Sequence, residues 1–204
     1  NLYWMARHME RAENTARLLN AQYQASMLPE SEVLVHRRWK AVLELFELEP
    51  QFINKKNKLI QNEVLNFMVL DEKNESSIYT CLKRARENAK AIRGVLPTEL
   101  WELINLAMLD FEFIFNSKNW IRTLEKNLDW VKQQSHLFRG VLEGTMPRNE
   151  FLYFTKIGMY IERADNTARI LDINFLLNQT SIEKYNSEKS ENLSLFDYSN
   201  NSFS

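Results

Sequence analysis

Glycine and proline are scarce in this sequence, since each occurs four times in 204 residues. Both residues concentrate in turns, so a β-rich domain with many tight connections is disfavoured. No segment alternates polar and apolar residues between turn signals, as a half-buried strand does. Long stretches instead repeat apolar residues every three or four positions. We therefore expect an all-α fold with helices joined by short loops.

Cysteine is rare, and the sequence has neither an excess of one charge nor long apolar runs. The single Cys81 excludes an intramolecular disulfide and agrees with a reducing, cytoplasmic setting. The formal net charge of −1 gives no general field that would attract nucleic acid or an anionic membrane. No apolar run is long enough to span a bilayer, and no signal peptide is visible. We expect neither nucleic acid nor membrane as a partner. Asn1 is not an initiator methionine, so a trimmed N-terminus is expected.

The sequence does contain an internal repeat of eight residues. Residues 10–17 read Glu-Arg-Ala-Glu-Asn-Thr-Ala-Arg, and residues 162–169 read Glu-Arg-Ala-Asp-Asn-Thr-Ala-Arg. The two copies differ only by Glu13 against Asp165. The repeat preserves arginine, asparagine and carboxylate positions and not only an apolar pattern, so it marks a candidate polar site as well as a fold element.

Apolar periodicity predicts a bundle of about six to seven helices, in which the two repeat helices are related by pseudo-two-fold symmetry. The domain is expected to cover residues 1–178, and residues 179–204, rich in Ser and Asn, are expected to form a flexible polar tail. The predicted helices cover residues 2–27, residues from Ser31 toward Pro50, residues 59–70, 76–95, residues from Pro97 onward, residues 117–143, and residues from Pro147 to about Asn178. Their periodicity assigns Leu106 and Leu109 to the apolar face of the helix that begins at Pro97, and Leu137 to the inward face of the helix over residues 117–143.

In each repeat copy, helical geometry separates a polar stripe from a ridge of small residues. Glu10, Asn14 and Arg17 lie on one stripe, and Glu13→Arg17 is an i,i+4 pair with the acid in the favourable N-terminal position. The second copy repeats this stripe and the pair Asp165→Arg169. The ridges consist of Ala12 with Ala16 and of Ala164 with Ala168. The candidate polar site comprises Arg7, Glu10, Arg11, Glu13, Asn14, Arg17, Glu162, Arg163, Asp165, Asn166 and Arg169.

Two interpretations of the stripe stay open at this point. In the first it is a solvated face whose ion pairs each contribute about 0–1 kcal/mol. In the second, the alanine ridges bring the two helices together about a pseudo-two-fold axis, and an arginine of one copy engages a carboxylate of the other. The duplication favours the second interpretation, because a solvated face would tolerate Lys for Arg. The network could then be structural as readily as catalytic.

Metal binding and nucleophilic catalysis are disfavoured. Di-metal helical bundles place a histidine three residues after a glutamate, whereas Glu10 is followed at that spacing by Glu13 and not by histidine. Guanidinium groups in the stripe would also repel a cation. We interpret the scattered His8, His36 and His136 as surface or helix-packing residues, and Cys81 as a core thiol. No metal and no cofactor are expected.

Four stretches resemble the Alpha-E family, an all-helical domain with a Glu-Arg motif. They are Asn1-Leu2-Tyr3-Trp4 through Leu19, residues 70–89, Leu96-Pro97-Thr98-Glu99-Leu100-Trp101, and Glu162–Asp172, in the order of the family. The resemblance implies a helical bundle encoded beside bacterial ATP-grasp and transglutaminase-like proteins. Two departures stand out: family members usually begin a few residues earlier and continue well past the second copy. A truncated or divergent form is therefore expected.

The resemblance implies an accessory or binding protein of an ATP-grasp-linked system that modifies peptides or forms amide bonds. Its expected partners are an ATP-grasp amide ligase and a transglutaminase-like protein. The Arg/Glu/Asn cluster would bind the partner enzyme or a carboxylate- or amide-bearing substrate, since arginine clamps carboxylates and asparagine pairs with amides. The alternatives are an enzyme that uses Glu10 or Glu162 as general base in a shared pocket, and a purely structural interaction domain.

Overall fold

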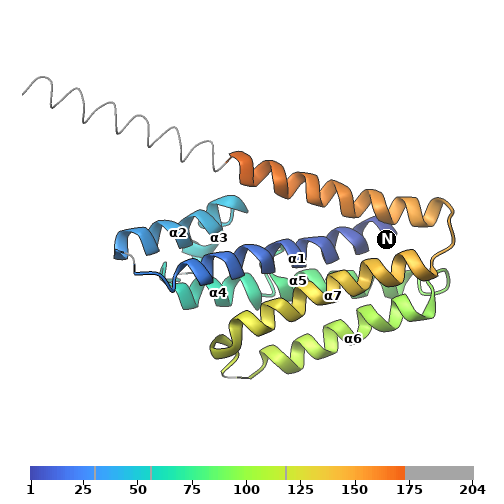
Figure 1. The fold of residues 1–204 in the computed structure, drawn as a ribbon, viewed down its shortest axis with the longest axis horizontal. Helices are drawn as coiled ribbons and strands as arrows, with labels where there is room; N and C mark the ends of the chain where they lie inside the picture. Colours follow the sequence, from blue (N-terminus) through green and yellow to red (C-terminus); the bar gives the residue numbers. More distant parts are fainter. Residues whose placement is uncertain (30, 56, 118, 173–204) are drawn as a thin grey trace, which may run out of the picture. The chain divides into compact units, whose positions relative to one another are not determined.

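The computed structural model describes residues 1–29, 31–55, 57–117 and 119–172 (Figure 1). These ranges contain helices and no strand, which confirms the predicted all-α fold. The labelled helices are α1 (Leu2–Ala25), α2 (Glu32–Leu45), α3 (Glu49–Asn54), α4 (Gln61–Val69), α5 (Ile78–Ala91), α6 (Thr98–Phe115) and α7 (Leu124–Thr145), with a 3-10 turn at Trp120–Thr123. A further helix covers residues 150–172.

The chain divides into two compact units, Asn1–Asn166 and Thr167–Ser204. In the second unit, residues 167–172 are described and are helical. The predicted polar tail at residues 179–204 and the predicted helix end near Asn178 lie outside the described residues.

Helices α1, α5, α6 and α7 form a closed four-helix arrangement, because α1 packs on α5 and α7, and α6 packs on the same two helices (Figure 1). Within this four-helix arrangement, neighbouring helices run antiparallel. Gln24, near the end of α1, donates to Glu125 at the start of α7 at 2.9 Å, whereas Glu10 accepts from Arg139 near the end of α7. Short connections join α5 to α6 and α6 to α7, whereas α1 is joined to α5 by residues 26–77, which contain α2, α3 and α4.

The helix boundaries follow local capping chemistry. The Ser31 and Ser77 side chains accept hydrogen bonds from the backbone N–H groups of Leu34 and Thr80, and thereby start α2 and α5. The prediction that the second helix continues toward Pro50 is wrong. Helix α2 ends at Leu45 because Glu47 adopts a φ of 58°, and Pro50 instead lies in the first turn of α3.

Two further predictions need correction. The long helix expected over residues 117–143 begins later, because a 3-10 turn precedes α7. Leu106, Leu109 and Leu137, expected to face inward, have exposed fractions of 53%, 47% and 53%. Helix α6 is apolar around more of its circumference than α5 and α7 can cover. The largest fully buried side chains include Trp39, Phe52, Phe111 and Phe138.

The first part of the last helix, residues 150–166, runs parallel to α1 and lies against it. Leu152, Thr155 and Met159 face inward and are buried. A Cβ atom placed on Gly158 would lie 2.2 Å from the backbone oxygen of Tyr3. Only glycine therefore permits this close approach of the two helix backbones.

The described helices include none that is both long enough and apolar enough to cross a membrane.

Candidate functional site: an arginine–carboxylate cluster

Three buried carboxylates lie where α1 meets α7 and residues 150–166. The Glu10 and Glu13 side chains of α1 are each 3% exposed, and the Glu162 side chain is 4% exposed. An ionised carboxylate removed from water is costly unless cations and hydrogen-bond donors replace the lost solvation. The surrounding arginines supply both, and together they form what we call the arginine–carboxylate cluster.

Glu162 accepts hydrogen bonds from two arginines of α1. Arg7 Nε donates to Glu162 Oε2 at 2.7 Å. Arg11 donates through Nε to Oε1 at 2.5 Å and through its terminal nitrogen to Oε2 at 2.9 Å. The Arg11 contact is bidentate, the geometry in which guanidinium recognises carboxylate best.

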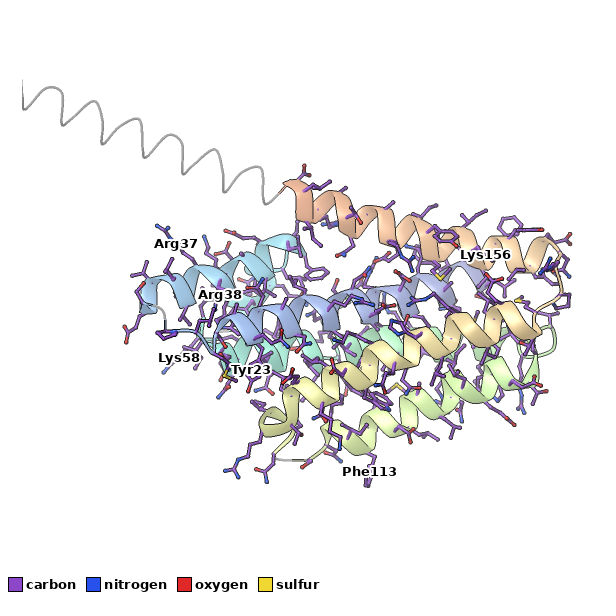
Figure 2. All side chains as sticks on the ribbon, in the orientation of Figure 1. Tyr23, Arg37, Arg38, Lys58, Phe113 and Lys156 are labelled. Atoms are coloured by element: carbon purple, nitrogen blue, oxygen red, sulfur yellow. The ribbon has the colours of Figure 1, made fainter. Side chains whose placement is uncertain are left out.

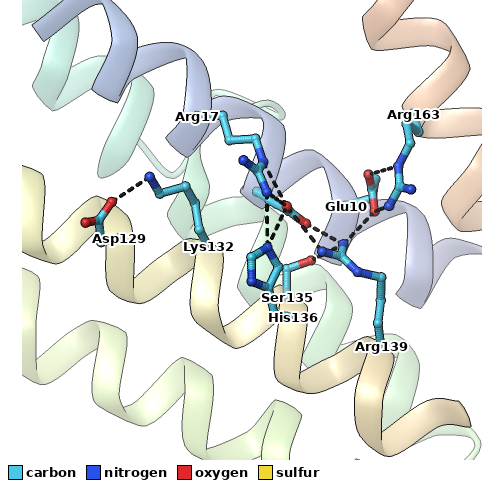
Figure 3. Close-up of polar contacts among 9 residues, drawn as sticks. Glu10, Arg17, Asp129, Lys132, Ser135, His136, Arg139 and Arg163 are labelled. Atoms are coloured by element: carbon cyan, nitrogen blue, oxygen red, sulfur yellow. Dashed lines mark hydrogen bonds and ion pairs between the residues drawn. The ribbon is translucent and has the colours of Figure 1, made fainter. Parts of the chain in front are cut away.

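Glu10 accepts the reciprocal contact from the second repeat copy. Arg163 donates through Nε to Glu10 Oε1 at 2.8 Å and through its terminal nitrogen to Oε2 at 3.1 Å (Figure 3). The Glu-Arg pair of each copy is therefore exchanged: Arg11 binds Glu162, and Arg163 binds Glu10. Contact between an arginine of one copy and a carboxylate of the other agrees with the second interpretation of the sequence, and the structure shows this contact in both directions. The pseudo-two-fold axis itself stays a prediction.

Glu13 is bound from α1 and from α7. Arg17 donates to Glu13 Oε1 at 2.6 Å, and Arg139 donates to Oε2 at 2.5 Å. Arg139 also reaches Glu10 at 3.2 Å, so one guanidinium bridges two carboxylates (Figure 3). The His136 ring nitrogen lies 3.3 Å from Glu13 Oε1. Arg17, Glu13, Arg139, Glu10 and Arg163 thus form a chain of alternating charge.

The hydrogen bonds determine how these groups ionise. Burial alone would raise the pKa of Glu13, but donors on Arg139, Ser135 and Arg17 outweigh it and lower the pKa to about 2. The hydrogen bond to Glu10 raises the pKa of Arg163. Burial opposes the charge of Arg11, yet its hydrogen bond and attraction to Glu162 raise its pKa. These pKa shifts favour the ionised forms of Glu13, Arg11 and Arg163.

Exposure divides the cluster into two layers. The carboxylates are buried, whereas the side chains of Arg17, Arg163 and His136 are 52%, 46% and 53% exposed. Arg7, Arg11 and Arg139 are intermediate, at 17%, 21% and 24%. The solvent-facing layer consequently presents guanidinium groups, and the negative charges lie beneath them.

The sequence prediction missed the contribution of α7. Arg139, Ser135 and His136 belong to no repeat, and only the packing of α7 on α1 brings them to Glu13. His136 was interpreted as a surface or packing residue, and it is indeed exposed. The one local signal is the i,i+4 spacing of Ser135 and Arg139, whose side chains are 3.2 Å apart. That spacing is too common to identify a site.

The remaining predicted site residues occupy varied surroundings. Asn14 is buried, and its Nδ2 has no hydrogen-bond partner among the described residues. Asp165, Asn166 and Arg169 are half-buried, and the pairing of Asp165 with Arg169 stays a prediction. The alanine ridge is confirmed in the first copy, where Ala12 and Ala16 are buried, and is wrong in the second. Ala164 is exposed, because the second copy turns its Glu162 face, not Ala164, toward α1.

A histidine and the cysteine lie buried near Arg11 on the α5 side of α1. Burial, assisted by the charge of Arg11, lowers the pKa of His8 to about 4, so the ring is neutral at pH 7. Burial raises the pKa of the Cys81 thiol to about 12, which agrees with the predicted core thiol and not with a nucleophile. The described part of the chain contains no group of three or more His, Cys, Asp or Glu residues that could hold a metal ion.

These features define an all-helical domain organised around two Glu-Arg pairs. Residues 1–197 match the model of the Alpha-E family, described as a predicted alpha-helical domain with a conserved ER motif. The chain belongs to the Alpha-E family. Searches of curated proteins and of solved structures found no match. In this chain, the Glu and Arg of each motif copy are the residues exchanged between Glu10–Arg11 and Glu162–Arg163.

Proposed function

We propose that this chain is a non-catalytic accessory protein of a bacterial, ATP-grasp-linked system that modifies peptides or forms amide bonds. It binds the partner enzyme, or a carboxylate- or amide-bearing group of the substrate, through the arginine–carboxylate cluster. The family match gives the helical fold and the ER motif, and the ATP-grasp setting is part of the proposal. The observation that carries the binding role is the layering of the cluster, with guanidinium groups toward solvent and carboxylates beneath.

The outer layer suits an anionic group. The side chains of Arg17 and His136 are more than half exposed, and Arg17 lies 3.1 Å from the His136 ring. Glu13 holds both in place from below, so little conformational entropy is lost when a further carboxylate binds. Arginine can offer such a group two parallel N–H donors. The buried amide of Asn14 follows Glu10 by one helical turn on the same stripe.

The rival hypothesis, catalysis by Glu10 or Glu162 as general base, fits the geometry less well. A general base needs an oxygen that can reach the proton of the substrate. Both oxygens of Glu162 accept from arginine, and both oxygens of Glu10 do the same. Each carboxylate is also at most 4% exposed. Access to substrate would require that at least one arginine pair be broken.

The accessory role is tested by purifying the chain with the ATP-grasp protein encoded beside it. We expect the two proteins to co-elute and the ligase to become more active when the chain is present. A ligase that is fully active alone and never associates with this chain would refute the accessory role. Turnover by this chain alone, abolished in Glu162→Gln with the fold retained, would establish the rival.

Carboxylate binding has its own test by isothermal titration calorimetry. The probes are an N-acetylated dipeptide with a free C-terminal carboxylate and the same dipeptide with a C-terminal amide. We expect the acid to bind more tightly than the amide to the native chain, and Arg17→Gln to remove the difference. Arg122→Gln changes an exposed arginine outside the cluster and is the matched control. Equal binding of both probes would exclude carboxylate recognition.

A further inference from the structure

A pocket opens where the end of α4, the first turn of α5 and the last turns of α6 meet. Its volume is about 330 Å³, which lies within the range of small-molecule sites in proteins. The residues that line it are Leu70, Tyr79, Phe111, Glu112, Phe115 and Asn116. None of them belongs to the arginine–carboxylate cluster, so the pocket is a separate candidate site.

Aromatic side chains form the rigid wall of the pocket. The Phe111 and Phe115 rings are stacked with their centroids 4.3 Å apart, and the Tyr79 ring lies 6.2 Å from that of Phe111. Phe111 and Phe115 are 1% and 2% exposed, so the surrounding packing fixes both rings. In other proteins a cavity of about 150 Å³ already accommodates benzene. The pocket therefore has room for one aromatic ring with a short side arm.

The polar side of the pocket carries negative charge. The Glu112 side chain is exposed near the end of α6 and forms no ion pair within the described part of the chain. The last turn of α6 contains no basic residue. Because the C-terminal end of a helix carries partial negative charge, lysine or arginine is the favourable residue there and an acid is not. A bound cation would supply the missing counter-charge.

The other charged groups at the pocket leave this negative charge in place. The Lys83 ammonium group lies over the Tyr79 ring, 5.5 Å from its centroid, and 3.9 Å from a carboxylate oxygen of Glu72. Lys83 and Glu72 therefore offset each other. The Asn116 side chain adds an amide oxygen that can accept a hydrogen bond from an ammonium group. Aromatic rings attract cations as well.

We propose that this pocket binds a small aromatic amine. The ring of the ligand would lie against Tyr79 and Phe115, and its ammonium group would donate hydrogen bonds to the Glu112 carboxylate and the Asn116 amide oxygen. An anionic ligand would meet the like charge of Glu112, which selects against it. The inference does not depend on the proposed function, because it concerns different residues and requires no partner protein.

An NMR titration of the isotopically labelled full chain tests the proposal. The probes share a phenyl ring and differ in charge, since phenethylamine is a cation, phenethyl alcohol is neutral and hydrocinnamate is an anion. We expect the amine to bind at least about tenfold more tightly than the alcohol, because charge-assisted hydrogen bonds are the stronger ones. Hydrocinnamate should bind most weakly. The backbone amide signals of residues 111–116 should shift most.

The variants change the charge at one position of the pocket. Glu112→Gln keeps the size of the side chain and should reduce the affinity for phenethylamine about tenfold, to that for the alcohol. Glu112→Lys places a cation in the pocket and should abolish binding of the amine. Asp110→Asn is the matched control, because Asp110 is an exposed acid of the same helix that does not line the pocket. This control should bind the amine as the native chain does.

A second control tests whether the phenyl ring adheres to exposed apolar surface instead. Phe113 follows Glu112, is 86% exposed and projects away from the bundle (Figure 2). Phe113→Ala should therefore leave the affinity for phenethylamine unchanged. Four results would overturn the proposal: no binding of the amine at millimolar concentration, equal affinity for amine and alcohol, unchanged amine affinity in Glu112→Gln, or loss of amine binding in Phe113→Ala.

Discussion

The two repeat copies have nearly the same sequence and different surroundings. The copy on α1 is enclosed, with Ala12 and Ala16 in the core and Glu13 bound to α7. The copy that begins at Glu162 buries that glutamate, while Ala164 faces solvent. What the copies share is the exchange of their Glu-Arg pairs. The motif therefore determines how α1 and residues 150–166 pair. The neighbouring helices determine how deeply the other side chains of each copy are buried.

The first prediction removes the carboxylate of the less enclosed copy. Glu162→Ala leaves Arg7 and Arg11 without their shared anion, and breaking a buried pair in this way typically costs about 3–5 kcal/mol. We expect this loss in the free energy of unfolding, measured by urea denaturation. Glu102→Ala is the control, because Glu102 is an exposed residue of α6. This variant should change the free energy of unfolding by less than about 0.5 kcal/mol. A Glu162→Ala variant as stable as the control would mean that the exchange contributes little.

The second prediction concerns the loss of stability at low pH. It compares His8, on the buried α5 side of α1, with Glu13 in the arginine–carboxylate cluster. His8 has a folded pKa of about 4, below its ordinary 6.5, so the unfolded chain takes up the proton first as pH falls. Stability is therefore full above pH 6.5 and declines as pH falls toward 4. Between pH 6.5 and pH 5 the expected loss is about 2 kcal/mol, measured by urea unfolding.

The charged side responds at lower pH. The pKa of Glu13 is lowered from 4.5 to about 2, so its contribution is full above pH 4.5 and is lost as pH falls toward 2. The window between pH 6.5 and pH 5 therefore separates the contribution of His8 from that of Glu13. His8→Phe keeps a ring beside Trp4 and should flatten the profile there. If the slope in this window persists in His8→Phe, another group titrates.

The third prediction tests the close approach that brings the two copies together. Gly158→Ala introduces a Cβ atom against the Tyr3 carbonyl, and overpacking of this kind costs about 1–3 kcal/mol. Gly140→Ala is its matched partner, since α7 leaves open space there. This control should stabilise the chain by about 0.5–1 kcal/mol. Melting temperatures that move in the same direction in both variants would contradict the close packing.

The fourth and smallest effect is expected at Arg17, the exposed end of the series of alternating charges. The Arg17 side chain is 52% exposed, and Arg139 also binds its partner Glu13. Arg17→Ala should therefore cost no more than about 1 kcal/mol in urea unfolding. A loss as large as that of Glu162→Ala would show that Arg17 is not the peripheral residue that its exposure indicates. The ligand-binding role proposed for Arg17 would then be difficult to separate from folding.

The repeat and the apolar periodicity predicted the all-α fold and the buried Cys81, and they favoured contact between an arginine of one copy and a carboxylate of the other without showing that the contact is reciprocal. Apolar periodicity gave wrong assignments at positions where the packing of other helices determines whether a side chain is buried. It assigned Leu106 and Leu137 to the core, although no described helix covers them, and it extended α2 past Glu47, whose backbone conformation ends the helix. Arg139 could not be predicted as a site residue, because nothing local to α7 indicates which helix it faces.

A double-mutant cycle on Arg11 and Glu162 tests the central claim most directly, namely that the two motif copies hold the helices together by exchanging partners. The single variants Arg11→Met and Glu162→Gln and the double variant are compared by urea unfolding. Direct contact at 2.5 Å predicts a coupling energy of about 1–3 kcal/mol, with the double variant less destabilised than the sum of the two single variants. Additive losses would contradict the claim.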